Sequence, residues 1–130
     1  MSPSRKYKDY RIYSCLILNR LVSALDIDLN QPNLEEKLDD ILEQSAGRGL
    51  TKGDIIHEIR SNHTMTNKIL NMLVDDGLVA IEKQEKSYEI NITREGIIHC
   101  RKFNEFYKKI YRDQIEDHYR FTGKPGWAEE

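Results

Sequence analysis

The residues between Thr64 and Asn71 mix apolar side chains with short side chains that form hydrogen bonds. If this segment is a helix, burial of its apolar residues turns outward a polar face with Thr64, Asn67, Lys68 and Asn71. Thr66 is expected to contact DNA with them. An asparagine amide can pair with the N6 and N7 edge of adenine, and a lysine can reach guanine acceptors or a phosphate. The pattern therefore predicts a helix that reads base edges in the major groove of DNA. An ordinary solvated helix face is the alternative.

Acidic residues stand only at the far end of this expected helix, at Asp75 and Asp76. Its N-terminal half would present the positive end of the helix dipole, which favours phosphate. Residues that can contact phosphates flank the helix: Lys52, Arg60, Ser61, Asn62 and His63 before it, and Lys83, Gln84 and Lys86 after it. Glu82 and Glu85 stand beside the later lysines, so a solvated run of charges is the alternative there.

The spacing of apolar residues predicts the elements that position these side chains. A short helix begins at Thr51, which forms a capping-box pattern with Asp54, and residues 60–63 form a polar turn. A second helix covers about residues 64–76, ends at Gly77, and buries Met65, Ile69, Met72 and Leu73. Apolar residues then alternate with polar ones on both sides of a polar stretch, which predicts a β-hairpin over residues 79–92 with a loop of about four or five residues.

Another helix is expected before this pair. Asn33 can cap it, with Glu36 completing a capping box, and the buried stripe is Leu34, Leu38, Ile41 and Leu42. The segment Gly47–Gly49 ends this helix because glycine readily leaves the helical conformation.

Three stretches carry a resemblance to a known family: residues 50–56 (LTKGDII), 66–79 (TNKILNMLVDDGLV) and 88–96 (YEINITREG). Residues 36–100, half of the chain, resemble the winged helix-turn-helix regulators of the MarR and PadR kind. The resemblance implies a mainly α fold with a small β-hairpin wing (α+β) and a recognition helix that binds DNA. The extra helices at both ends look like those of archaeal or plasmid-borne members, which dimerise through their terminal helices.

The two ends of the chain are expected to be helical. Residues 9–25 hold apolar residues at helical spacing, and a long helix capped by Thr93 reaches about residue 119. The stripe of this long helix is too large to bury on the winged unit alone, and it would be a large apolar patch in water. We expect it to pair with a second copy of the chain, through Tyr10, Tyr13, Ile17, Leu21, Phe103, Phe106, Tyr107, Ile110, Tyr111, Ile115 and Tyr119. Packing of the two terminal helices within one chain is the alternative.

Composition limits the function. The chain has 130 residues and a net charge of −2, with five basic residues against one acid in residues 1–24 and seven acids against two basic residues in residues 25–50. A surface that binds anions must therefore be local, with the acidic segment facing away from it. No apolar run has the length of a membrane span or of a signal peptide, so we expect a cytoplasmic, nucleoid-associated protein.

The sequence has no pattern typical of an enzyme. Cys15 and Cys100 are not paired in a CxxC motif, and the four histidines are not spaced as metal ligands. The segment Gly47–Gly53 lacks the spacing of a phosphate-binding loop. We expect no catalytic residues, no metal and no cofactor. A small-molecule effector is conceivable, but no residue points to one.

These observations divide the chain into a basic arm with a helix (1–32), a winged helix-turn-helix DNA-binding domain (33–96), a dimerisation helix (97–122) and a flexible tail (123–130). We expect sequence-specific binding of double-stranded DNA as a homodimer by a transcriptional repressor. A plasmid-partition or nucleoid-organising protein would carry the same pattern. A winged-helix protein–protein interaction module without DNA binding is a further hypothesis, favoured by the net negative charge.

Overall fold

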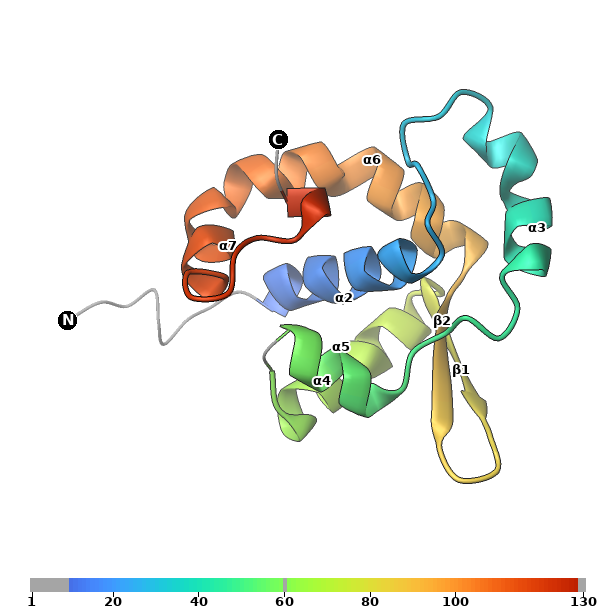
Figure 1. Cartoon of the computed structure of the whole chain (residues 1–130), viewed down its shortest axis with the longest axis horizontal. Helices are drawn as coiled ribbons and strands as arrows, with labels where there is room; N and C mark the ends of the chain where they lie inside the picture. Colours follow the sequence, from blue (N-terminus) through green and yellow to red (C-terminus); the bar gives the residue numbers. More distant parts are fainter. Residues whose placement is uncertain (1–9, 60, 129–130) are drawn as a thin grey trace.

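The computed structural model describes residues 10–59 and 61–128, and the side chains from residue 12 onward within these ranges (Figure 1). The chain is mainly helical and has a small two-stranded antiparallel sheet. Helix α2 (Tyr10–Ala24) contacts α4 (Lys52–Ile59), α5 (His63–Asp75), α6 (Arg94–Ile110) and β2 (Tyr88–Ile92), and so lies at the centre of the molecule. Helices α6 and α7 lie on one side of α2 in Figure 1, and α4, α5 and the hairpin lie on the other.

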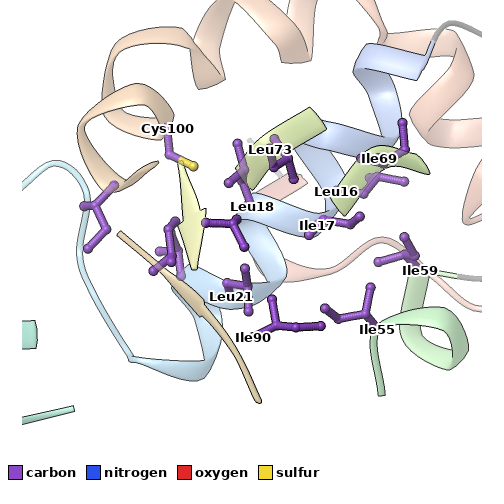
Figure 2. Packing of buried hydrophobic residues seen from close by; sticks show 14 of the residues in the cluster. Leu16, Ile17, Leu18, Leu21, Ile55, Ile59, Ile69, Leu73, Ile90 and Cys100 are labelled. Carbon is purple, nitrogen blue, oxygen red and sulfur yellow. The ribbon is translucent and has the colours of Figure 1, made fainter. Parts of the chain in front are cut away.

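Helix α2 is buried on nearly all sides, because it packs between these two groups of elements. Its apolar residues Ile12, Cys15, Leu16, Ile17, Leu18, Leu21 and Val22 are each at most 5% exposed. Figure 2 shows Leu16, Ile17 and Leu21 of α2 gathered with Ile55 of α4, Ile69 of α5 and Ile90 of β2. A helix that is apolar around its whole circumference is typical of a core helix rather than a surface one.

Helix α3 (Leu34–Gln44) buries Leu34 and Leu38, while Ile41 and Leu42 are half-buried. The predicted cap at Asn33 is wrong. Asn33 has a left-handed conformation (φ 61°) and makes no side-chain capping bond, because this backbone conformation differs from the extended one of an N-cap residue. The helix ends before Gly47, whose φ is +86°.

A single residue after α3 extends the sheet. The Leu50 N–H donates to the Ile90 carbonyl at 3.0 Å, and the Ile90 N–H donates to the Leu50 carbonyl at 2.7 Å. A Cβ on the preceding Gly49 would lie 2.6 Å from the Ile90 carbonyl oxygen, so glycine is needed for this close approach. This bridge was not among the elements predicted from the sequence.

Helices α4 (Lys52–Ile59) and α5 (His63–Asp75) form the expected helical pair. The capping box of α4 is confirmed: the Asp54 N–H donates to Thr51 Oγ1 at 3.1 Å, and the Thr51 N–H donates to Asp54 Oδ2 at 3.3 Å. The predicted left-handed Gly77 is also confirmed, with φ of 77°. The Leu78 N–H donates to the Leu73 carbonyl and the Gly77 N–H to the Val74 carbonyl, which is the Schellman pattern that ends α5.

Strands β1 (Val79–Lys83) and β2 (Tyr88–Ile92) form the predicted hairpin. Val79 pairs with Ile92 and Ile81 pairs with Ile90, so these side chains share one face of the sheet. The loop has four residues, within the predicted length, and the Gln84 N–H closes it by donating to the Ser87 carbonyl at 2.7 Å.

The long C-terminal helix is two helices, α6 (Arg94–Ile110) and α7 (Arg112–His118), and not one as expected. The break is at Tyr111, whose φ of −106° and ψ of 21° leave the helical region. This bend returns α7 to the core, where Tyr111, Ile115 and Tyr119 are 3–7% exposed. The predicted cap at Thr93 is confirmed, since its Oγ1 accepts from the Gly96 N–H at 3.0 Å.

The expected tail after residue 122 also packs on the molecule in part. The 3₁₀ turn η1 (Gly126–Ala128) places Trp127 and Ala128 against the core. The part of the expected tail that the structure describes therefore contacts the core through Trp127 and Ala128.

A buried amide pair joins α2 to α6. Asn19 Nδ2 donates to Asn104 Oδ1 at 2.9 Å, and Asn104 Nδ2 donates to Asn19 Oδ1 at 2.7 Å. Asn19 is 1% exposed and Asn104 is 9% exposed. Because each amide satisfies the other, the pair fixes the register of the two helices inside an otherwise apolar contact.

Both cysteines are buried free thiols, at α2 and α6. Burial raises the pKa of Cys15 to about 12, and it raises the pKa of Cys100 as well. Both sulfurs therefore stay protonated near neutral pH, where a protonated thiol is a poor nucleophile.

Candidate nucleic-acid interface

Four of the side chains predicted to read DNA are exposed on α5: Thr64, Asn67, Lys68 and Asn71. They lie in the first nine residues of the helix, and its first turn contains no acidic residue. Thr64 is followed three and four residues later by Asn67 and Lys68, and Asn71 lies four and three residues after these, so all four share one side of α5. The structure therefore brings these four together, as the sequence predicts.

Thr66 was predicted to contact DNA together with these four residues, and this prediction is wrong because its side chain is buried. Thr66 is 0% exposed, and the buried face of α5 consists of Thr66, Ile69, Leu70 and Leu73. Met72, predicted to be buried, is 40% exposed, and Met65 is half-buried. Compared with the expected orientation, α5 is rotated about its axis by less than one residue step, which is about 100°.

The start of α5 is stabilised by Asn62. Its Oδ1 accepts a hydrogen bond from the Met65 N–H at 2.7 Å, so Asn62 caps the helix. The sequence had predicted a phosphate contact for this residue. The cap occupies the side-chain oxygen and leaves the amide nitrogen of Asn62 as a donor. His63 and Thr64, the first residues of α5, are exposed, so this end of the helix can receive an anion.

The other predicted phosphate contacts before α5 differ in their exposure. Lys52 and Ser61 are half-buried, and the Ser61 N–H donates to the Ile56 carbonyl at 3.0 Å. Arg60, also predicted to contact phosphate, lies outside the described residues. Lys52 is the first residue of α4.

The hairpin loop exposes all three predicted contacts, Lys83, Gln84 and Lys86. Gln84 is held to the strand after it, since its Nε2 donates to Glu89 Oε1 at 3.1 Å. The other oxygen of Glu89 accepts the Gly49 N–H at 2.9 Å. The loop projects from the body of the molecule on the same side of α2 as α4 and α5 (Figure 1).

The residues predicted to form a dimer interface divide into two groups. Ile17, Leu21, Tyr111, Ile115 and Tyr119 are 0–7% exposed within one chain, so the prediction that they contact a second copy is wrong. These residues are buried because the terminal helices pack on each other within one chain, which was the alternative given above. The bend at Tyr111 brings Ile115 and Tyr119 into this core. The side chain of Tyr10 lies outside the described part, and Tyr13 is half-buried beside His118.

The second group stays at the surface of α6. Phe106 is 55% exposed and Ile110 is 51% exposed, while Phe103 and Tyr107 are half-buried. The aromatic rings contact one another, with centroids 6.2 Å apart for Phe103 and Tyr107 and 6.1 Å apart for Phe106 and Tyr107. We call Phe103, Phe106, Tyr107 and Ile110 the α6 strip.

His99 lies beside the α6 strip. Its Nε2 is 3.3 Å from the Tyr107 hydroxyl, and its ring centroid is 4.7 Å from that of Phe103. Burial lowers the pKa of His99, so the imidazole is neutral near pH 7. A neutral ring extends the apolar character of the strip.

Within residues 10–59 and 61–128, no three His, Cys, Asp or Glu side chains gather as metal ligands would. In the same part of the chain, no helix has both the length and the apolar character needed to cross a membrane. Comparison of the chain with protein-family models, curated proteins and solved structures returned no match.

Proposed function

We propose that residues 34–96 are a winged helix-turn-helix unit that binds double-stranded DNA in a sequence-specific manner, with α5 in the major groove. The order of elements supports this proposal: α3, the Leu50 bridge, α4, α5 and the β1–β2 hairpin follow one another as in that motif. In this proposal α4 supports α5 from behind, and the hairpin is the wing that lies along the DNA backbone.

The observation that carries the proposal is the exposed face of α5. Asn67 and Asn71 can each bond the N6 and N7 edge of an adenine, and Lys68 can bond guanine or a phosphate. Asp75 is the first acid of the helix and lies at its C-terminal end, away from the half that would enter the groove. Lys83 and Lys86 would add phosphate contacts from the wing, despite the neighbouring Glu82 and Glu85.

The α6 strip supports a homodimer. Two half-exposed side chains, Phe106 and Ile110, lie one turn apart on a helix that is not part of the proposed DNA-contacting surface. Pairing of two copies through this strip would remove the apolar side chains from water. A symmetric dimer would place two copies of α5 on one duplex, so the preferred DNA would contain two related half-sites. In a promoter, such a dimer would act as a repressor by occupying the site.

A second candidate function has its own observation. Met72 and Val74 are 40% and 39% exposed on α5, and Tyr88 is 50% exposed on β2. These apolar residues, together with Asp75 and Asp76, fit a protein-binding surface better than a DNA-binding one. The second candidate is therefore a winged-helix protein–protein interaction module that uses the same elements.

The deciding experiment measures binding of a labelled random duplex by fluorescence anisotropy at increasing salt. DNA binding should weaken by about 0.9 log units per log unit of salt for each phosphate neutralised. Duplexes selected from a random pool should then share half-sites. Binding to one isolated site indicates a regulator, and dense binding along repeats indicates a partition or nucleoid-organising protein. Absence of duplex binding at low salt would exclude the DNA proposal and favour the protein-binding module.

Variants assign the binding to residues. On a selected duplex, Asn71→Ala should lose about 1–3 kcal/mol of discrimination between the preferred and altered sites. Lys86→Ala should weaken all duplexes equally. Lys37→Ala, at an exposed position of the acidic helix α3, is the control and should change neither the discrimination between sites nor the affinity for duplexes. Equal small effects of Asn71→Ala and Lys37→Ala would contradict the assignment of α5 as the recognition helix.

Self-association is tested separately by light scattering. The wild-type chain should have twice the mass of one chain, and Phe106→Glu with Ile110→Glu should reduce this to a single mass, because each introduces a charge into the pairing surface. Phe121→Glu, at an 81% exposed residue outside the α6 strip, is the control. A wild-type mass of one chain would exclude the dimer.

A further inference from the structure

A groove of about 310 Å³ lies where α6, α7 and the C-terminal segment meet. Four basic, two acidic and two apolar residues line it: Lys108, Lys109, Arg112, Lys124, Glu105, Glu116, Ile115 and Ala128. The groove therefore has a surplus of positive charge, although the net charge of the chain is −2. We call it the basic groove. It shares no residue with the α6 strip.

The two carboxylates of the basic groove are already paired. Lys108 Nζ lies 2.9 Å from Glu105 Oε2, and Lys124 Nζ lies 3.6 Å from Glu116 Oε2. Lys109 and Arg112 are exposed, and neither forms an ion pair with a residue that the structure describes. The surplus positive charge therefore resides on Lys109 and Arg112, which stand three residues apart.

Helix α3 has the opposite character. Its exposed side carries five acidic residues, namely Glu35, Glu36, Asp39, Asp40 and Glu43. Arg94 Nη1 lies 3.3 Å from Asp39 Oδ1, while Asp40 and Glu43 form no ion pair within the described part of the chain. Like charges three or four residues apart on a helix repel one another, so a basic partner would stabilise this side of α3.

The acidic side of α3 and the basic groove belong to opposite ends of the molecule. In Figure 1 the long axis is horizontal, with α3 at the right-hand end and α7 at the left-hand end. Helix α3 therefore does not reach the groove of its own chain. We propose that the basic groove binds α3 of a second copy, with Asp40 and Glu43 of one copy paired with Lys109 and Arg112 of the other.

The number of free charges favours a second copy over duplex DNA as the occupant. Tight duplex binding uses about 6–10 phosphate contacts, and Lys109 and Arg112 supply two cations. Two cations three residues apart match the two carboxylates of Asp40 and Glu43, which are also three residues apart. The charges of the two surfaces are thus complementary in sign, number and spacing.

The proposed contact joins two different surfaces and therefore leaves one of each free at the ends of a pair. Contacts of this kind extend into an open head-to-tail row instead of closing into a symmetric dimer. Ion pairs between exposed side chains are weak and are screened by salt, so the row should form at low ionic strength. The inference depends neither on DNA binding nor on pairing through the α6 strip.

The test measures the mass of the full chain by sedimentation velocity, without DNA. At about 0.01 M salt the average mass should rise with protein concentration, and at about 1 M salt it should stay at the value set by the α6 strip, because the Debye length falls from about 30 Å to about 3 Å. The high-salt measurement therefore separates the proposed contact from the apolar one.

Reversal of charge on either surface should abolish the rise at low salt. The groove variant is Lys109→Glu with Arg112→Glu, and the helix variant is Asp40→Lys with Glu43→Lys. All four positions are exposed, so neither variant disturbs the core. A mixture of the two variants should regain the rise, because each then meets a surface of opposite charge.

The hairpin loop offers a matched control. Lys83→Glu with Lys86→Glu reverses the same number of exposed positive charges as the groove variant, at positions outside the basic groove. This variant should associate at low salt as the wild-type chain does. An equal loss in the control and the groove variant would show that net charge governs association, and it would overturn the proposal.

Other results would also overturn it. These are a mass that does not depend on salt, a rise that persists in the groove variant, and a mixture of the groove and helix variants that stays at the mass of each variant alone. If the groove variant weakens duplex binding and leaves self-association unchanged, the basic groove is a second DNA contact and not a docking site for α3.

Discussion

The middle of the chain and its two ends use apolar residues in different ways. In the middle, α5 buries one face and exposes the other, and its exposed face carries Asn67 and Asn71, while the hairpin buries residues mainly of β2. At the ends, α2 is buried on nearly all sides, and α6 and α7 cover it. The ends thus form the support on which the middle presents its polar face.

This difference separates two kinds of mutational effect. Substitutions in α2 should reduce stability, because each of its apolar side chains lies in the common core. Substitutions on the exposed face of α5 should change binding and leave stability nearly unchanged. The α6 strip is the exception at the ends, since Phe106 and Ile110 are about half exposed.

The largest expected effect compares two apolar residues of the terminal helices. Leu18→Ala in α2 should lower the free energy of unfolding by about 2–5 kcal/mol, because Leu18 is 1% exposed and its removal leaves a cavity. Phe106→Ala should lower the free energy of unfolding of the monomer by less than about 0.5 kcal/mol. Urea denaturation at low protein concentration measures both. Similar losses of unfolding free energy in the two variants would contradict the distinction between the buried helix α2 and the exposed α6 strip.

The next effect concerns the Asn19–Asn104 pair. Asn19→Ala should lower the free energy of unfolding by about 1–3 kcal/mol, because it leaves the Asn104 amide buried without its partner. The double variant Asn19→Leu with Asn104→Leu should recover much of this loss, since neither helix then buries an unpaired polar group. Urea denaturation of the two single leucine variants and the double variant forms a thermodynamic cycle. Purely additive losses would contradict a direct coupling between the two amides.

Local signals explain why much of the middle could be predicted. The Thr51–Asp54 capping box, the left-handed Gly77 and the alternation in the hairpin each act over a few residues, and the structure contains all three. The exception is Asn33, where the chain entering α3 adopts a left-handed conformation that the capping pattern did not reveal.

The features that could not be predicted depend on contacts between distant residues. Leu70 and Met72 are both apolar, so the sequence alone does not say which of them α5 buries. The Leu50 bridge is one residue long and has no pattern of its own. The bend at Tyr111 decides whether the C-terminal stripe faces α2 or a second copy, and no glycine or proline marks it in the sequence.

Two glycines, Gly49 and Gly53, test how closely the segment after α3 approaches strand β2. Gly49→Ala should destabilise the fold by about 1–3 kcal/mol, because its Cβ would lie 2.6 Å from the Ile90 carbonyl oxygen. Gly53→Ala in α4 should stabilise it by about 0.4–1 kcal/mol, since its Cβ meets only Thr51 Oγ1 at 3.8 Å. Thermal melting of both variants checks the prediction. Equal effects of the same sign would contradict the close approach at Gly49.

The smallest effect tests the orientation of α5 itself. Thr66 Oγ1 is buried and has no hydrogen-bond partner among the described residues, so Thr66→Val should raise the free energy of unfolding by about 1 kcal/mol. Thr64→Val, two residues earlier on the exposed face, should give no such gain. Because Thr66 faces the core, its valine variant should also retain full affinity for a selected duplex, whereas Thr64→Val should reduce it. A loss of stability in Thr66→Val would mean that this hydroxyl has a partner and that α5 is oriented closer to the expected position.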